Sequence, residues 1–168
     1  MPERISPYTS SPTPAKTNAP ITEFRGEYRF LSNFWFAGAG LDAMVGPTVE
    51  HVFQAAKTLV PSERGEILAA STPLKAKSLG RTVTLRPDWE DVKLGVMAQL
   101  QSSKYAQHDM AQLLIATGDA ELVEGNHWCD TFWGRCLCRV HGSVETGPVG
   151  HNWLGRILMI QRSVLRRS

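Results

Sequence analysis

Residues 48–60, TVEHVFQAAKTLV, combine a helical apolar pattern with a narrow polar stripe. The apolar positions recur at three- and four-residue spacing, which predicts a helix that ends at Pro61. Glu50, Gln54 and Lys57 stand at positions i, i+4 and i+7 and therefore share one face, with Glu50 and Lys57 about 10 Å apart along the axis. This stripe is either a solvated helix face or a carboxylate and an amine presented into a pocket.

Outward from this segment, the pattern predicts mostly helices. We expect an α+β fold, a helix-dominated single domain with a small sheet. The expected helices are 48–60, 62–70, 73–80, 88–103 (with Asp88 as N-cap), 106–117 and 152–166. The expected non-helical segments are a strand plus turn at 27–36, a loop or hairpin at 37–47, short strands at 81–86 and 120–124, and a loop-rich stretch at 125–150.

Composition limits the possible classes of protein. The chain has 168 residues, 42% of them hydrophobic, which suffices for one folded domain with a core. Three cysteines do not suggest a disulfide-rich secreted scaffold. Residues 1–20 are rich in proline, serine and threonine, and we expect a disordered tail there and a folded domain over 21–168. No apolar run resembles a signal peptide or a membrane helix, so we expect a cytoplasmic protein without membrane contact.

The net charge of +2 conceals three segments of opposite sign. Residues 71–86 carry four basic and no acidic side chains, residues 119–130 carry four acidic and no basic ones, and residues 156–168 carry four arginines. The near-neutral total excludes a broadly basic protein. It does not exclude a phosphate-bearing substrate that meets one local basic segment.

The stretch 124–134, EGNHWCDTFWG, places Trp128, Phe132 and Trp133 around the carboxylates of Glu124 and Asp130. Indole rings beside a carboxylate suit a pocket that stacks a flat ring and removes water from an acid. The alternative is an aromatic core cluster.

Five candidate metal ligands lie close together in the sequence: His127, Cys129, Cys136, Cys138 and His141. The last two cysteines are spaced C-x-C, whereas structural zinc sites commonly use a C-x₂₋₄-C pair with a second pair elsewhere. We therefore expect loop or buried thiols, no metal and no other cofactor. Phosphate-loop, dinucleotide and serine-nucleophile motifs are absent from the sequence.

A series of short motifs, in this order, resembles the NADAR family of YbiA-like N-glycosidases. The resemblance covers residues 22–165 and is most specific in E-H-x-F-Q-A-x-K, D-x-x-W-G and G-x-N-x-L-G. The matching segments are 30–34 (FLSNF), 50–57 (EHVFQAAK), 80–81 (GR), 88–90 (DWE), 113–118 (LLIATG), 122–124 (LVE), 130–134 (DTFWG), 150–155 (GHNWLG) and 158–159 (LM).

The resemblance implies hydrolysis of a bond between a ribose carbon and a base nitrogen. Such a reaction uses a carboxylate near the ribose C1′ and an acid for the departing nitrogen. Glu50 matches the motif glutamate and is the expected essential carboxylate, and Asp130 is the expected second carboxylate or ribose anchor. Lys57 matches the motif lysine, either as a Schiff-base nucleophile or as the cation that keeps Glu50 ionised. The expected substrate-binding residues are Ser32, Asn33, Phe34, Arg81, Trp89, Trp133, Gly134, Asn152 and Gly155.

Each of these binding residues has an expected role. Arg81 would bind phosphate, and Asn33 and Asn152 would bind ribose hydroxyls. Phe34, Trp89 and Trp133 would stack on the base, although Trp89 could equally pack as a staple next to the Asp88 cap.

The resemblance leaves two substrate classes open. One is a ribosylamino-pyrimidine phosphate of riboflavin synthesis, and the other is ADP-ribosylated guanine, free or within nucleic acid. The rival hypothesis is a module that binds ADP-ribose or a nucleotide without catalysis. An insertion at 135–149, longer than the glycine-rich link expected for the family, bears on which substrate fits. The sequence does not indicate the oligomeric state.

Overall fold

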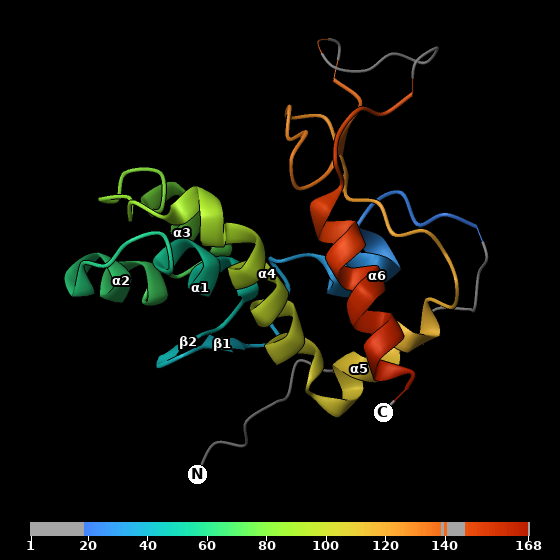
Figure 1. The fold of residues 1–168 in the computed structure, drawn as a ribbon, viewed down its shortest axis with the longest axis horizontal. Coiled ribbons are helices and arrows are strands. Elements are labelled where there is room, and N and C mark those ends of the chain that lie inside the picture. Colours follow the sequence, from blue (N-terminus) through green and yellow to red (C-terminus); the bar gives the residue numbers. More distant parts are fainter. Residues whose placement is uncertain (1–18, 139, 141–146, 168) are drawn as a thin grey trace.

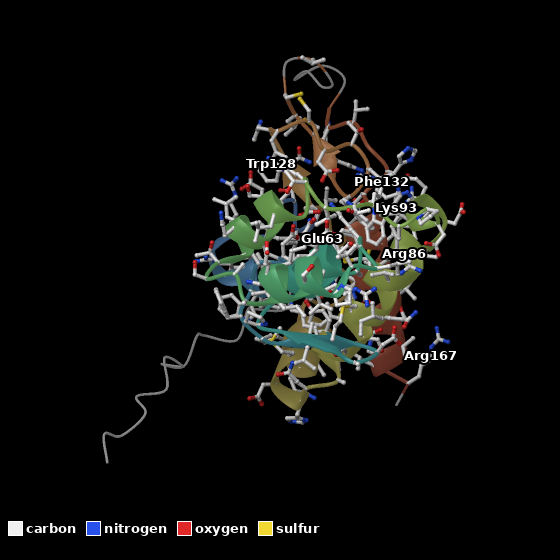
Figure 2. All side chains as sticks on the ribbon, turned by 90° about the vertical axis from the view of Figure 1, so that its left-hand side faces the viewer. Glu63, Arg86, Lys93, Trp128, Phe132 and Arg167 are labelled. Carbon is white, nitrogen blue, oxygen red and sulfur yellow. The ribbon has the colours of Figure 1, made fainter. Side chains whose placement is uncertain are left out.

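The computed structural model describes residues 19–138, 140 and 147–167 (Figure 1). Most of the expected tail at 1–20 and the middle of the 135–149 insertion lie outside these residues. The described part contains seven helices and four short strands. Figure 2 shows the side chains that they carry. The helices are η1 (Gly26–Leu31, 3₁₀), α1 (Val49–Ala55), α2 (Pro61–Leu68), α3 (Pro73–Leu79), α4 (Trp89–Tyr105), α5 (His108–Ala116) and α6 (Trp153–Leu165). The strands are β1 (Ala39–Leu41), β2 (Met44–Gly46), β3 (Gly125–Asn126) and β4 (Arg135–Cys136). The expected helix-dominated α+β class is confirmed.

Helix α4 is the central element of the fold (Figure 1). The β1–β2 hairpin and α1 pack on one part of it, and α5 and α6 pack on another. The two strands of the hairpin are antiparallel, with Ala39 opposite Gly46, whereas β3 and β4 form a separate parallel pair. Leu100 of α4 and Leu154 and Leu158 of α6 are fully buried in the core between these groups.

Helix α1 ends earlier than the periodicity of 48–60 predicts. Its C-cap is Ala56, and Thr58 then leaves the helical path to pair with Leu85 in an isolated antiparallel bridge. Pro61 begins α2 instead of ending α1, because proline is well suited to the first turn of a helix, where its missing N–H needs no partner. Lys57 therefore lies in a turn and not on the helix face.

Three strand predictions are corrected. The 27–36 segment contains the 3₁₀ helix η1 and then turns, and 81–86 and 120–124 form only the bridges Thr58↔Leu85 and Ile21↔Leu122. At 81–86 and 120–124 the backbone pairs with its neighbour at a single bridge, which is shorter than the two-residue strands β3 and β4. No helix in the described part of the chain is long and apolar enough to cross a bilayer.

Candidate functional site

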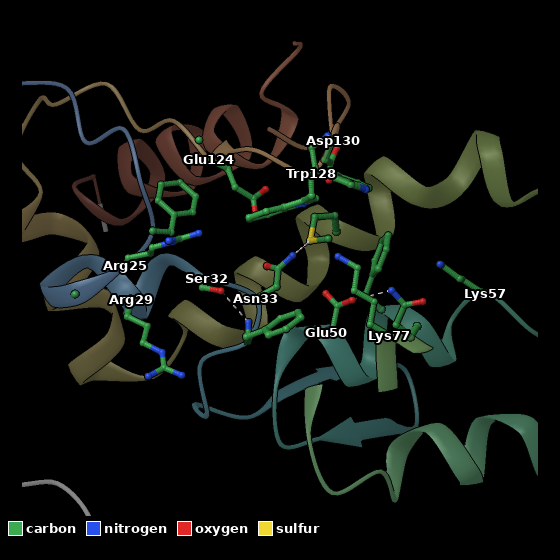
Figure 3. Close-up of a pocket in the computed structure, with 18 residues that line it drawn as sticks. Arg25, Arg29, Ser32, Asn33, Glu50, Lys57, Lys77, Glu124, Trp128 and Asp130 are labelled. Carbon is green, nitrogen blue, oxygen red and sulfur yellow. Dashed lines mark hydrogen bonds between the residues drawn. The ribbon is translucent and has the colours of Figure 1, made fainter. Parts of the chain in front are cut away.

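A cavity of about 540 Å³ lies where α1, the 24–34 segment and the 124–133 segment meet (Figure 3). Its walls carry three carboxylates, four cationic side chains and several aromatic rings. The lining residues are Phe24, Arg25, Gly26, Arg29, Ser32, Asn33, Phe34, Glu50, Phe53, Gln54, Lys57, Lys77, Met97, Glu124, Gly125, Trp128, Asp130 and Trp133.

Glu50 faces the cavity from the first turn of α1. Thr48 caps this helix by accepting from the His51 N–H, and the Glu50 N–H donates to the carbonyl of Asn33 at 3.0 Å. Glu50 is only 5% exposed, and Gln54 Nε2 donates to its Oε1 at 2.8 Å. The polar stripe on α1 is thus a cavity wall and not a solvated face.

The ionisation of Glu50 reflects two opposing effects. Burial raises the pKa of its carboxyl, and the ionised Asp130 adds to the rise. Lys77, the Gln54 hydrogen bond and Lys57 oppose this shift, with Lys77 contributing the most. Three groups therefore favour the carboxylate form of Glu50 despite its burial.

Lys57 reaches the cavity from the turn that follows α1. Its Nζ lies 3.5 Å from the Gly80 carbonyl and 6.0 Å from the centre of the Phe53 ring. Burial lowers the pKa of Lys57, Glu50 opposes this effect, and Lys77 and Arg81 add to it. Its amine is therefore deprotonated more readily than that of an exposed lysine.

Lys77, on α3, is a cavity residue that the sequence pattern does not single out beyond its place in the basic segment 71–86. Its ammonium lies 5.8 Å from the Phe34 ring centre, on the same side of the cavity as Glu50 (Figure 3). Among the cations, it opposes the rise in the pKa of Glu50 the most. The expected effect of Lys57 on the pKa of Glu50 is therefore supplemented by a larger effect of Lys77.

Glu124 projects into the cavity from the opposite wall, immediately before β3 (Figure 3). Its backbone N–H donates to Asn152 Oδ1 at 3.0 Å, and its carbonyl accepts from the Arg135 N–H at 3.0 Å. Burial, followed by the ionised Asp130 and Glu50, raises the pKa of Glu124 to about 8. A pKa in this range favours the protonated form of Glu124 at neutral pH.

Asp130 lies beside Glu124, at the turn that leads to Trp133. Its Oδ1 accepts from the N–H groups of Phe132 at 3.1 Å and Trp133 at 2.8 Å. The side chain of Asn126 fixes the preceding loop, since its Oδ1 accepts from the Asp130 N–H at 3.1 Å and its Nδ2 donates to the Asp130 carbonyl at 2.8 Å. The Asp130 carboxylate is thus held in one orientation.

Four of the expected binding residues line the cavity: Ser32, Asn33, Phe34 and Trp133. Ser32 Oγ accepts from the Phe34 N–H at 3.1 Å, and Asn33 Oδ1 accepts from Gln101 Nε2 at 2.7 Å. Lys104, fully buried on α4, donates to the Ser32 carbonyl at 3.0 Å, and its burial lowers its pKa to about 7. Side chains of α4 therefore fix the shape of this wall.

Gly134, Asn152 and Gly155 do not line the cavity, but they fix the segment that carries Glu124. Asn152 Nδ2 donates to the Leu122 carbonyl at 2.8 Å, while its Oδ1 accepts from the Glu124 N–H. A Cβ at Gly155 would lie 2.0 Å from the Leu122 carbonyl oxygen, and one at Gly134 would lie 2.1 Å from that of Glu124. The glycines permit these close backbone approaches.

Trp89 and Arg81 also lie off the cavity wall. Trp89 is 6% exposed and packs on Phe53, with 5.1 Å between ring centres, as the staple alternative predicts. Arg81 is exposed and acts on Lys57 only through its charge. Two other arginines, Arg25 and Arg29, line the cavity instead. They stand together at one side of it, on and just before η1 (Figure 3).

The geometry defines the class of site. A cavity of this size, with aromatic walls and with two carboxyl groups on opposite sides whose pKa values are both raised by burial, is an acid–base site for a small polar ligand.

The chain belongs to the NADAR domain family, whose model matches residues 22–166. This result confirms the resemblance found in the sequence. The chain is 38% identical over 142 residues to the N-glycosidase YbiA of Escherichia coli, covering 83% of this chain and 82% of that protein. It is 34% identical over 142 residues to a riboflavin biosynthesis protein of Vibrio vulnificus, covering 82% of this chain and 35% of that one. The solved NMR structure of E. coli YbiA superposes with a TM-score of 0.75 at 34% identity, covering 93% of this chain and 90% of that one.

Proposed function

We propose that this protein is an N-glycosidase that hydrolyses the ribose–nitrogen bond of a phosphorylated, ribosylated base. The proposal rests above all on Glu124, a carboxyl whose pKa is raised to about 8 inside the cavity and opposite Glu50. The names of the E. coli and Vibrio vulnificus relatives support the reaction type and favour a ribosylamino-pyrimidine phosphate as the substrate.

Glu124 is the proposed general acid. As the bond between C1′ and nitrogen breaks, its electron pair stays on the nitrogen, which takes the proton of Glu124. A carboxyl with an ordinary pKa near 4.5 would already have lost this proton at neutral pH. The environment of Glu124 therefore suits it to protonate a leaving group.

Glu50 is the proposed carboxylate partner. Positive charge develops on the ribose ring as the leaving group departs, and a nearby carboxylate stabilises this charge. The oxygen of a water molecule then bonds to C1′, and Glu50 accepts the proton that this water releases. Lys77 and Gln54 favour the ionised form that both roles require. Overall, one water is consumed, and free ribose phosphate and free base are formed.

The remaining lining residues suit the rest of such a substrate. The rings of Phe34, Trp128 and Trp133 offer faces and edges for a planar base. Arg25 and Arg29 offer guanidinium groups for a phosphate, a role that the sequence predicts for Arg81. Asp130, held by two backbone N–H groups, is placed to accept a hydrogen bond from a ribose hydroxyl.

The test is a comparison of products. The purified full chain is incubated with a ribosylamino-pyrimidine phosphate and, in parallel, with ADP-ribosylated guanosine, and the free base is quantified. We expect release from the first substrate and loss of release in Glu50→Gln and in Glu124→Gln. Glu66→Gln, an exposed carboxylate on α2, serves as the matched control.

Each other result has a defined meaning. Release from ADP-ribosylated guanosine alone would reassign the substrate and keep the reaction. Nucleotide binding with no release from either compound would refute catalysis and support the binding-module hypothesis.

A further inference from the structure

All three cysteines of the chain converge at one place, although the sequence separates them by up to nine residues. The sulfurs of Cys129, Cys136 and Cys138 lie within 4.8 Å of one another. Cys129 comes from the loop after β3, Cys136 is the last residue of β4, and Cys138 follows it. The C-x-C spacing predicts no metal site when only pairs of ligands along the chain are considered. In the fold, the parallel pairing of β3 with β4 brings the sulfur of Cys129 close to those of Cys136 and Cys138.

The backbone around these cysteines is fixed. Cys136 is fully buried, and its N–H and carbonyl pair with Val149 at 2.8 and 3.0 Å. The Asn126 side chain holds the loop that carries Cys129, accepting from the N–H of Trp128 at 3.3 Å and of Asp130 at 3.1 Å. The three sulfurs therefore meet on a preformed scaffold.

Two details suggest a purpose beyond packing. Cys129 has φ of +68°, a left-handed conformation that is unfavourable for a residue with a side chain and that recurs at functional sites. The Cys138 N–H donates to Cys136 Sγ at 3.2 Å, a bond that strengthens as negative charge develops on sulfur. Both details suit thiolate ligands.

We propose that Cys129, Cys136 and Cys138 bind one Zn²⁺ ion as thiolates, and they are the three ligands that the described residues supply. His141, the other candidate ligand that follows Cys138 in the sequence, lies outside the described residues. Zinc–sulfur bonds of about 2.3 Å in tetrahedral geometry place sulfurs about 3.8 Å apart, which small side-chain rotations would provide here. Thiolates favour zinc among the common divalent ions. A disulfide between Cys129 and Cys138, whose sulfurs are 3.1 Å apart, would leave the converging Cys136 unused.

The site adjoins the cavity but is distinct from it. Trp128 and Asp130, on either side of Cys129, line the cavity, whereas none of the three cysteines does. Bound zinc would thus hold this wall of the cavity in place without touching the substrate. This proposal does not depend on the identity of the reaction.

The experiment uses the reduced full chain and Zn²⁺ alone. Zinc affinity is measured against a competing chromophoric chelator, stoichiometry by native mass spectrometry, and the three thiols by their reaction with a disulfide reagent. We expect one Zn²⁺ per chain and protection of the thiols. Co²⁺ in place of Zn²⁺ should give the charge-transfer absorption of thiolate ligands.

Variants make the assignment specific. Cys129→Ser and Cys138→Ser should each weaken zinc binding at least about 100-fold, since even residues that only support a ligand contribute 10–100-fold. Both cysteines lie outside the core, so these variants test binding even if Cys136→Ser fails to fold. His108→Ala, which removes an exposed imidazole on α5, should bind zinc with unchanged affinity.

Three results would each overturn the proposal: no zinc bound at tenfold excess, zinc binding insensitive to the cysteine variants, or a Cys129–Cys138 disulfide that forms in air despite equimolar zinc.

Discussion

Replacement of Glu124 by glutamine should lower activity without lowering stability. The fold raises the pKa of this proposed acid, so it favours the protonated form at a pH at which an exposed glutamate is ionised. With a pKa of about 8, Glu124 is about 90% protonated at pH 7, whereas a carboxyl at 4.5 would be less than about 1% protonated. Glutamine keeps the shape but has no acidic proton. We expect kcat/KM to fall by about 10²–10⁴-fold, the usual contribution of a general acid.

The same pKa shift fixes the sign of the stability change. The folded chain binds the Glu124 proton more tightly than the unfolded chain, so this contribution to stability is complete below pH 4.5 and is lost as the pH rises through about 8. Ionisation of Glu124 in the folded chain therefore costs at most a few kcal/mol, since a tenfold change in proton affinity corresponds to about 1.4 kcal/mol and solvent screens this partly exposed side chain. Glu124→Gln should therefore be the more stable protein at pH 8.5 and nearly equal to the parent at pH 4.5.

The assay pairs initial rates of base release from pH 5 to 9.5 with urea unfolding at pH 4.5 and 8.5. In the parent, kcat/KM should fall tenfold per pH unit above about pH 8. Glu66→Gln, on the surface of α2, should change neither measurement. The reasoning would be refuted if Glu124→Gln retained near-normal activity, or if it were less stable than the parent at pH 8.5.

Three further predictions follow from the contacts around the cavity. Lys77→Met should lower kcat/KM more at pH 6 than at pH 8, because loss of the ammonium raises the pKa of Glu50 further. A pH–rate profile that does not shift would contradict this pairing. Borohydride added during turnover should leave no reduced adduct on Lys57, since water attacks C1′ directly, and an adduct by mass spectrometry that disappears in Lys57→Ala would establish the Schiff-base alternative. Asn152→Ala should lower the free energy of unfolding by about 1–3 kcal/mol, because the buried Glu124 N–H loses its acceptor. Urea unfolding measures this loss, and an unchanged midpoint would contradict it.

Helical periodicity predicts most of the fold because it is a local property. Pro73 begins α3 and Gly80 follows its last residue, as the sequence indicates, and α6 runs one residue inside the expected 152–166 at each end. The local sequence pattern does not predict the structure of the 27–36 segment. Its aromatic residues favour a strand, but Lys104, on a distant helix, donates to the carbonyl of Ser32 and helps to fix the turn after η1. Such a contact has no counterpart in the local sequence.

The candidate site was predictable to the extent that its chemistry lies within one segment. Glu50 and Gln54 share a helix face, and that face does meet a cavity. Glu124 was visible only as a carboxylate among aromatic residues, because its raised pKa arises from burial and from Asp130 and Glu50 together. Asn152 resembles a ligand-binding residue in the sequence, yet its two side-chain hydrogen bonds are both made to the backbone.

The acidic and basic segments of the sequence supply charged side chains to opposite walls of the cavity. The acidic segment 119–130 supplies Glu124 and Asp130 to one wall, and the basic segment 71–86 supplies Lys77 to the wall that carries Glu50. Burial raises the pKa of both glutamates, but the neighbouring carboxylates add to the rise at Glu124, whereas the lysines oppose it at Glu50. The surrounding charges therefore act in opposite directions on two buried glutamates with similar intrinsic pKa values. A reaction that needs a proton donor on one side of a bond and a negative charge on the other requires this difference, and the fold creates it by bringing together segments that the sequence keeps apart.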